Sequence, residues 1–288
     1  MKRIKQAIKI CRYQLLVMCN GYKLFVMPVC LIIFMLNGML PFRKFLKVVG
    51  EGASPFLFPF LFSDVILSAL IFATALPFFI DAPFYDRQQC YVIVRSEISE
   101  WALGQIFYVF LISFMYASFL LILSLVLLIP YISFQAEWGR IWSTLALTNA
   151  ETDYALPFSV SSKVIFEYTP WKAVGITFLL VDLICSFYGF LQWYLNLYVG
   201  KKIGLVVTLF SALLVIRVRY FPGWVMYLTP AGWADLSNLS EYTSHGISLE
   251  KAVTILTIGL LFLVILVFHK TTHSDFVKQR SFYGRYYS

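Results

Sequence analysis

Long apolar segments without charge are the feature that most constrains how this chain folds. The clearest is Ile106–Ile129, which contains no Asp, Glu, Lys or Arg. A helix of about 20 apolar residues crosses the roughly 30 Å hydrocarbon layer of a membrane. Of the 288 residues, 60% are hydrophobic and 13% are charged, which lies outside the usual balance of a soluble domain. We therefore predict an all-α integral membrane protein with a single membrane domain.

The apolar segments predict about six transmembrane helices joined by short connections. The predicted spans are residues 24–40, 56–80, 102–129, 173–199, 203–217 and 252–268. The fifth span is short and leads into residues 221–233, which Pro222, Gly223, Pro230 and Gly232 interrupt. This segment cannot form one straight helix, so we expect a broken re-entrant or interfacial pair before the last span.

Residues 1–23 predict an amphipathic helix, because apolar and basic positions separate around the helix axis. One face holds Ile4, Ala7, Ile8, Cys11 and Leu15, and the remaining surface holds Lys2, Lys5, Lys9 and Arg12. We expect this helix to lie in the inner headgroup layer against anionic lipid. The alternative is a short soluble amphipathic helix.

The Lys and Arg residues predict the orientation in the membrane. Most of the 23 basic residues fall in segments that share a side with the N-terminus. Both termini are therefore predicted to be cytoplasmic, with residues 269–288 as a tail, although Arg43, Lys44 and Lys47 reduce the asymmetry. No cleavable signal peptide is expected, because the basic N-terminal stretch is long and no small-residue cleavage site follows. The net charge of +8 lies beside apolar segments, so no nucleic-acid partner is expected.

Disulfide and metal chemistry find little support in the sequence. The five cysteines contain no C-x-x-C pair; they are Cys11, Cys19, Cys30, Cys90 and Cys185. His269 and His273 have a spacing compatible with a metal pair on a helix, but no third ligand accompanies them. We expect an interfacial pair beside Lys270, with no metal and no cofactor bound by this chain.

The predicted cytoplasmic loop, residues 81–101, carries charges of both signs around a short apolar core. Its candidate contact residues are Asp86, Arg87, Tyr91, Val94, Arg95, Glu97 and Trp101. Arginines in such a loop pair with carboxylates of a partner, while Tyr91 and Val94 fill a pocket. The pattern predicts a docking surface, and a solvated connector is the alternative.

Two carboxylates fall inside predicted spans, Asp64 in the second and Asp182 in the fourth. Each lies about nine residues, or roughly 13 Å of helical rise, from the predicted outer end of its span. An ionisable group inside the membrane is costly and by default indicates function, either binding of a cationic substrate or a proton relay. The alternative is that each is neutral or hydrogen-bonded to a neighbour, since Ser68 and Ser186 lie one helical turn on.

Two outer segments are further candidates for the substrate path. Residues 137–147 predict a helix that rests at the membrane interface as an anchor or, alternatively, as a substrate gate. Its apolar face holds Trp138, Ile141, Trp142 and Leu145. In the interrupted segment, the candidate residues of an exit path are Pro222, Pro230 and Trp233.

Several of these segments resemble one known family. Phe79–Arg87, followed by Val94-Arg95-Ser96 and Trp101–Gln105, looks like the first cytoplasmic loop of bacterial type 2 ABC exporter membrane subunits. Trp138-Gly139-Arg140, running on to Thr144-Leu145-Ala146, resembles the element after the third span, and Leu228–Trp233 resembles the Pro-containing outer segment before the sixth. With the N-terminal helix and the six-span layout, the resemblance covers nearly the whole chain.

The resemblance implies a permease of the bacterial cytoplasmic membrane that exports an amphipathic peptide, antibiotic or lipid-like molecule. It implies that this chain pairs with a second copy or a homologous chain on two separate ABC ATP-binding subunits, which bind ATP and magnesium. In that family the N-terminal helix and the first cytoplasmic loop, here residues 1–23 and 83–101, contact the ATPase. This chain contains no G-x-x-x-x-G-K-[ST] motif, so ATPase activity is expected only in the partner.

Two other classes of membrane protein are alternatives to a permease. A proton-coupled secondary transporter would use Asp64 and Asp182, but the inverted repeat that would favour it is not found. An intramembrane serine hydrolase would need a nucleophile beside a histidine at membrane depth. His245 is predicted in an outer loop and no G-x-S-x-G motif is present, so the sequence argues against the enzyme.

Overall fold

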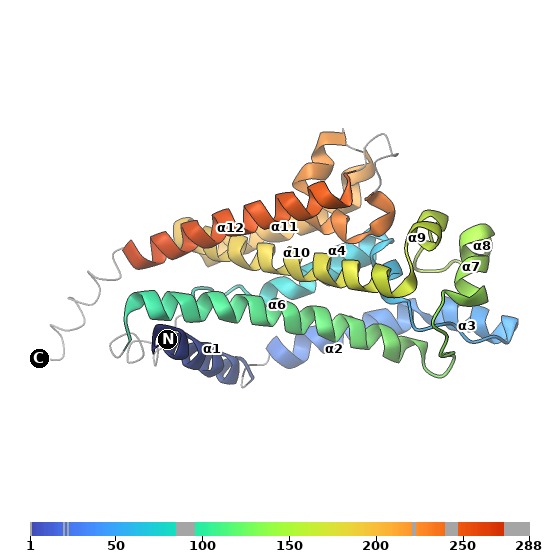
Figure 1. The fold of residues 1–288 in the computed structure, drawn as a ribbon, viewed down its shortest axis with the longest axis horizontal. Helices are drawn as coiled ribbons and strands as arrows, with labels where there is room; N and C mark the ends of the chain where they lie inside the picture. The colour runs from blue at the N-terminus through green and yellow to red at the C-terminus, as the bar shows by residue number, and fades with distance from the viewer. Residues whose placement is uncertain are drawn as a thin grey trace, which may run out of the picture.

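The computed structural model describes residues 2–19, 21, 23–84, 96–220, 223–239 and 247–273. In these residues all regular secondary structure is helical, apart from one isolated bridge between Ala53 and Ile132. The long helices run side by side along one axis (Figure 1). The predicted all-α membrane architecture is confirmed at this level.

Three helices are long and apolar enough to cross a membrane. They are α6 (Ile98–Leu128), α10 (Pro170–Tyr198) and α12 (Leu249–His273). They cover three of the predicted spans, 102–129, 173–199 and 252–268, and α6 runs antiparallel to α10 and α12 (Figure 1). A capping box of Glu97 and Glu100 begins α6, and a proline at the first helical position begins α10, so both starts follow from the local sequence.

A fourth candidate span is a pair of helices bent by 41°, α2 (Lys23–Gly38) and α3 (Leu40–Val49). The bend falls just before Pro41. Arg43 of α3 donates from Nη2 and Nε to the carbonyl of Leu127, at 3.1 and 3.3 Å. This carbonyl belongs to the last turn of α6, where helix carbonyls lack intrahelical partners and favour a positive charge. Arg43, which weakened the predicted charge asymmetry, therefore has a structural role.

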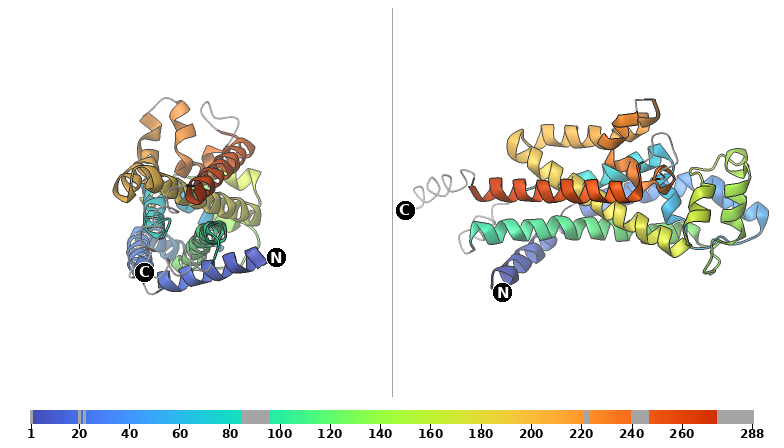
Figure 2. Two further views of the ribbon diagram at one scale, coloured as in Figure 1. Left: turned by 90° about the vertical axis from the view of Figure 1, so that its left-hand side faces the viewer. Right: turned by 45° about the horizontal axis from the view of Figure 1, so that its top comes forward.

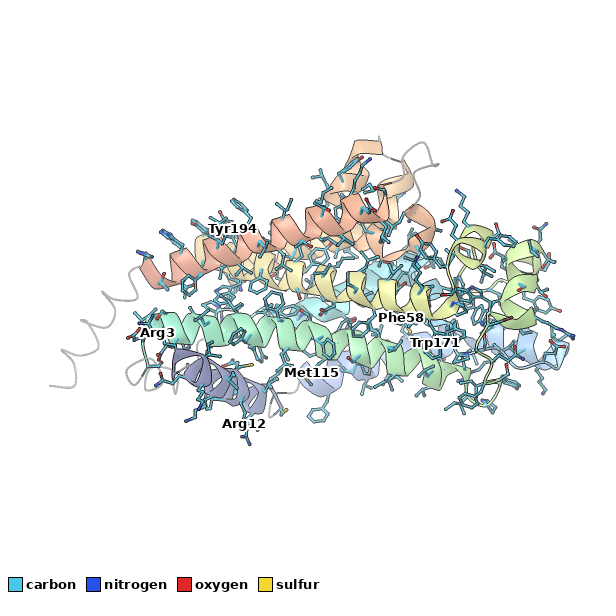
Figure 3. All side chains as sticks on the ribbon, viewed as in Figure 1. Arg3, Arg12, Phe58, Met115, Trp171 and Tyr194 are labelled. Atoms are coloured by element: carbon cyan, nitrogen blue, oxygen red, sulfur yellow. The ribbon has the colours of Figure 1, made fainter. Side chains whose placement is uncertain are left out.

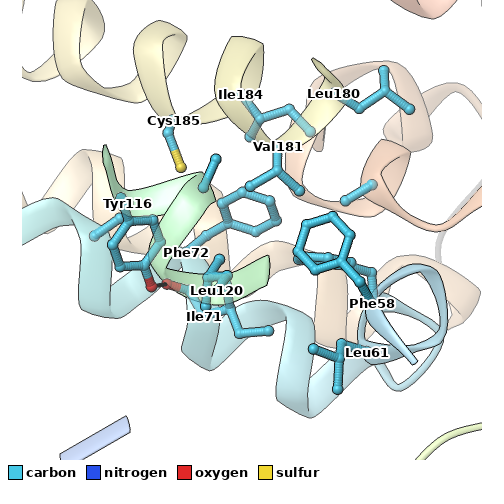
Figure 4. Packing of buried hydrophobic residues seen from close by; sticks show 14 of the residues in the cluster. Phe58, Leu61, Ile71, Phe72, Tyr116, Leu120, Leu180, Val181, Ile184 and Cys185 are labelled. Carbon is cyan, nitrogen blue, oxygen red and sulfur yellow. Dashed lines mark hydrogen bonds between the residues drawn. The ribbon is translucent and has the colours of Figure 1, made fainter. Parts of the chain in front are cut away.

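The second predicted span, 56–80, is two helical pieces instead of one helix. A 3-10 helix, η1 (Phe58–Phe62), is followed by a break at Ser63–Asp64, and then by α4 (Val65–Ala75) and η2 (Leu76–Phe78). α4 packs in the core against α6 and α10, where Phe72, Leu120 and Val181 meet (Figure 4). The hydroxyl of Tyr116 on α6 donates to the carbonyl of Ile71 at 2.6 Å, which ties α6 to α4.

The chain after α10 is also broken. α11 (Lys201–Leu213) has 13 residues, about 20 Å of helix, and continues into η3 (Leu214–Tyr220). The described part of the segment before α12 consists of η4 (Gly223–Leu228), η5 (Pro230–Ala234) and η6 (Leu236–Asn238). These short turns agree with the expectation that this segment cannot be one straight helix.

The bundle has two different ends. The terminal end holds α1 (Lys2–Cys19) and the last turn of α12 (Figure 1). The distal end holds α3 and three short helices, α7 (Gly139–Leu147), α8 (Ala150–Asp153) and α9 (Ser162–Glu167).

Helix α1 lies across the bundle under α6 (Figure 2, left). It buries Ala7, Ile10, Cys11 and Gln14, while Ile4 and Ile8 are more than half exposed. The predicted apolar face of α1 is therefore partly wrong. The buried face is rotated because α6 offers the small residue Gly104, where a Cβ would lie only 2.8 Å from Ile10 and 2.9 Å from the Ala7 carbonyl. Ile4 and Ile8 remain available for lipid.

We expect Gly104→Ala to push α1 away from α6, at a cost of about 1–3 kcal/mol, because backbone and a branched side chain block the added methyl group. The matched control is Gly175→Ala on α10, where a Cβ meets nothing within 4 Å. That change should be neutral or stabilise by about 0.5–1 kcal/mol.

Maleimide labelling of Cys11 measures this effect, with Cys19, Cys30 and Cys90 replaced by serine. Burial shields this thiol and raises its pKa, so it should react slowly in the parent chain and in Gly175→Ala, and faster in Gly104→Ala. Equal rates in all three proteins would contradict the described packing of α1.

Candidate functional site

The predicted docking residues belong to the loop 81–101, of which the structure describes residues 81–84 and 96–101. Five of them, Asp86, Arg87, Tyr91, Val94 and Arg95, fall outside the described residues. Glu97 caps α6 and forms an exposed ion pair with Arg3 of α1 at 3.4 Å. Trp101 is only 1% exposed and packs with Ile10 in the contact between α1 and α6. In this chain the Trp101 ring is covered by α1, and its contact with a partner stays a prediction.

Helix α1 presents a basic surface next to this loop. Lys5, Lys9 and Arg12 are exposed, and Arg12 lies on the side of α1 turned away from α6 (Figure 3). Because α1 is packed on the first turns of α6, this surface and the end of the loop form one rigid unit. A charged surface of this kind can steer and orient a partner with acidic groups.

The other end of the loop is held by an amide. Asn196, near the end of α10, donates from Nδ2 to the carbonyls of Ile80 and Ala82, at 2.9 and 2.7 Å. The Asp81 carbonyl between them accepts from the N–H of Phe84. Leaving one such buried polar group without a partner costs about 1–3 kcal/mol. Sequence reasoning missed Asn196, whose only sign was an amide in the last turns of an apolar span.

Two fully buried residues extend this contact to the next helix. The hydroxyl of Thr208 on α11 contacts the Gln192 side chain and also lies 3.0 Å from the Gly204 carbonyl, and Gln192 donates from Nε2 to Oδ1 of Asn196 at 2.8 Å. The two carbonyls that accept from Asn196 fix which way its amide points, and this in turn requires Gln192 to present its NH₂ group. Loop, α10 and α11 thus share one directed set of hydrogen bonds.

Asp64 does not sit inside a helical span. It is the N-cap of α4, where its Oδ1 accepts from the N–H of Leu67 at 2.8 Å. The predicted partner Ser68 donates instead to the carbonyl of Ala231, at 3.3 Å. Asp64 also lines a small cavity of about 160 Å³ between α2 and α4, walled by Phe34, Met35, Gly38, Met39, Ile66, Leu67 and Pro157.

Asp182 lies near the middle of α10 and has different surroundings. Among the described residues its Oδ1 is buried without a hydrogen-bond partner, and so is the hydroxyl of Ser186. The predicted bond between these two side chains is therefore not formed. Among the described residues, no hydrogen bond joins Asp182 to Asp64.

The candidates for an exit path are packed inside the bundle. Pro230 and Trp233 of η5 are buried, and the Ala231 carbonyl between them is held by Ser68 of α4. Pro222 falls outside the described residues. A path along this segment would require η5 to move away from α4.

Residues 137–147 also differ from the prediction. The four predicted apolar residues are buried against the protein, so this face is not open to lipid. Trp142 is enclosed by the rings of Phe42 and Phe60, with centroids 5.7 and 5.1 Å away. Its Nε1 donates to the Ser54 carbonyl, and Nε1 of Trp138 donates to the Tyr168 carbonyl. Both indole N–H groups therefore brace loop backbone at the distal end.

The distal end contains an open cavity of about 920 Å³ that the sequence did not reveal. Its walls come from three separate segments, residues 51–52, 133–143 and 165–170. Glu51, Glu137 and Glu167 line it together with Arg140, which pairs with Glu51 at 3.3 Å. Burial, and to a smaller extent the Glu167 carboxylate, raises the pKa of Tyr168 at its edge, so that hydroxyl stays neutral.

Substitutions of Asp64, the cap of α4, distinguish the effect of its hydrogen bond from the effect of its charge. We expect Asp64→Ala to destabilise the protein by about 0.5–2 kcal/mol, because the Leu67 N–H loses its acceptor. Asp64→Asn keeps an acceptor oxygen and should cost less. Thermal unfolding in detergent measures both variants. Equal losses would mean that the charge of Asp64, and not its capping bond, holds this break.

Comparison of the chain with protein-family models, with curated proteins and with solved structures finds no match. A functional assignment therefore depends on the arrangement of the residues described above.

Proposed function

We propose that this chain is the membrane subunit of an ATP-driven ABC exporter in the bacterial cytoplasmic membrane. It moves an amphipathic substrate, while a separate ABC ATP-binding subunit binds ATP and magnesium and hydrolyses the nucleotide. A second membrane subunit, identical or homologous, completes the transporter. The chain itself performs no catalysis.

The observation that carries this proposal is the junction between α1, the charged loop and α6. A basic amphipathic helix is packed at the same end of the bundle as the loop, and Arg3 of α1 pairs with Glu97 at the loop's end. The loop joins the broken segment η1–α4–η2 to the long helix α6. Force applied to this surface by a partner would therefore reach both a rigid helix and a broken one.

The proposed topology uses all six apolar segments. Helices α2 and α3, the segment η1–α4–η2, α6, α10, α11 with η3, and α12 would cross in turn, with the terminal end in the cytoplasm. The two broken segments reach across by combining short helices. Their breaks are held by packing and side-chain donors, which makes non-helical backbone tolerable inside a membrane.

The proposed substrate path follows the broken segments. The cavity between α2 and α4 is mainly apolar with one carboxylate, Asp64, which suits an apolar group beside a polar or cationic one. Pro230 and Trp233 would close the path on the distal side, and η5 would have to shift to open it.

One observation favours a second candidate, a proton-coupled secondary transporter. Asp182 is an ionisable residue near the middle of a candidate span, and its buried carboxylate oxygen has no hydrogen-bond partner in the described part of the chain. Its proposed companion Asp64 is already engaged as a helix cap. This reduces the support for a two-carboxylate relay.

Charge reversal in the loop tests the docking role. We expect Arg87→Glu combined with Arg95→Glu to fold normally but to lower transport per ATP hydrolysed at least about tenfold, because attractions across the interface become repulsions. The control, Lys163→Glu with Lys251→Glu, changes the same charge at exposed distal positions and should leave the ratio unchanged. Coupled transport in proteoliposomes gives the ratio. An unaltered ratio in the loop variant would count against docking.

The source of energy separates the two candidates. The chain reconstituted alone should be inactive under an imposed proton gradient, and activity should require the ATP-binding subunit and magnesium. Solute uptake or release by the chain alone, abolished by Asp182→Asn, would replace the proposed exporter by the proton-coupled transporter.

A further inference from the structure

The α10–α11 hairpin is bonded to the beginning of the charged loop, although it is distant from it in the sequence. The loop continues covalently into α6 at one end, through Ser96 and Glu97, and into η2 at the other. Its η2 end is also attached to α10 by the two hydrogen bonds from Asn196 to the carbonyls of Ile80 and Ala82. A displaced loop would therefore pull on three elements, η2 and α6 through the chain and α10 through one side chain.

The hydrogen bonds around Asn196 restrict movement of the loop entrance relative to α10. Both hydrogens of its amide are used by the loop carbonyls, and its oxygen is held by Gln192, which in turn contacts the hydroxyl of Thr208 of α11. Gly204 of α11 brings its backbone against this set, since a Cβ there would lie 2.5 Å from the Asn196 oxygen. The hairpin and the loop entrance are thus joined both by hydrogen bonds with defined donors and acceptors and by close packing.

The nearby ion pair between Lys201 and Asp81 attaches the loop to α11 only weakly. Its atoms are 3.2 Å apart, but both side chains are half exposed. Solvent screening and side-chain entropy leave such pairs with little net strength. The partly buried amide of Asn196, with two hydrogen bonds to loop carbonyls, is the stronger connection.

The hairpin leads from Asn196 toward the proposed substrate path. α11 continues into η3, where Val215 packs on Gly232 of η5, at 3.2 Å from the position of a Cβ. The neighbouring Ala231 carbonyl accepts from Ser68 of α4. A shift of α11 along its axis would therefore disturb the contact between η5 and α4 that closes the path.

We propose that Asn196 is a positioning residue that passes movement of the loop to the α10–α11 hairpin and from there to η5. The inference rests on the proposed function in one respect: ATP binding by the partner is the event that moves the loop. Asn196 itself contacts neither nucleotide nor substrate.

The test uses the full complex with its ATP-binding subunit, in nanodiscs, and the variant Asn196→Asp. This change preserves the size of the side chain and removes both donors to the loop carbonyls. Hydrogen–deuterium exchange is compared between the nucleotide-free and the ATP–vanadate-trapped complex. Two regions are read out: residues 199–205 at the start of α11, and residues 96–103 at the start of α6.

In the unmodified complex we expect the exchange of both regions to respond to nucleotide. In Asn196→Asp the response of α11 should become clearly weaker than in the unmodified complex, although η2 and α4 still contact α11, and that of α6 should remain, because α6 is joined to the loop covalently. Transport per ATP hydrolysed should fall at least about fivefold. A merely structural defect would alter both regions in both states and would not separate the two responses.

Two further variants keep the result interpretable. Thr208→Val removes the hydroxyl that contacts Gln192 without touching the loop carbonyls, and should lower the coupling ratio by about two- to fivefold even if Asn196→Asp fails to fold. Asn149→Asp makes the same chemical change at an exposed distal residue and should have no effect.

The outcomes separate the two proposals. An undiminished α11 response in Asn196→Asp, or an unchanged ratio in Thr208→Val, would overturn the role of Asn196 alone. A complex in which neither α6 nor α11 responds to nucleotide, even without substitution, would overturn the proposed function and this inference with it.

Discussion

Every break in a helix of this bundle exposes backbone carbonyls or N–H groups that an apolar environment cannot satisfy, and the rest of the structure depends on how side chains satisfy them. Arg43 holds the last turn of α6, Asp64 caps α4, Ser68 holds the Ala231 carbonyl, and Asn196 holds two carbonyls at the start of the loop. Each bond joins elements that are far apart in the sequence or fixes the point where a helix restarts. The conformation of the non-helical backbone is therefore fixed by specific hydrogen bonds, as the conformation of the helices is.

This constraint divides the bundle into two kinds of parts. α6, α10 and α12 are continuous, satisfy their own backbone and form a scaffold. The segments η1–α4–η2 and α11–η6 are interrupted, and their stability depends on a few donors from their neighbours. Elements of this kind can exist in two arrangements when one bond is exchanged for another, whereas continuous helices move as rigid bodies. The proposed substrate path and the proposed coupling through Asn196 both lie in the interrupted parts.

Some features were predictable because they depend on neighbours in the sequence. The three long helices follow from uninterrupted apolar length, and the end of any straight helix near Pro222 and Pro230 follows from the missing donor and ring of proline. The face of α1 was predicted only in part, because helical periodicity does not reveal that Gly104 creates the site for Ile10. Trp138 and Trp142 had the spacing of membrane anchors, but their indole N–H groups bind loop carbonyls. Spacing cannot distinguish a lipid-facing surface from a protein-facing one.

The sequence by itself determined that this chain is a helical membrane protein, which segments are apolar, where helices must stop, and that the chain carries no phosphate-binding motif. Those properties depend on composition and on local backbone chemistry. Only the tertiary structure decided that Asp64 is a cap, that a buried oxygen of Asp182 has no described hydrogen-bond partner, and that Asn196 joins the loop to α10. The reason is that a hydrogen bond between distant residues depends on where two helices lie relative to each other, and that relation is set by packing across the whole bundle.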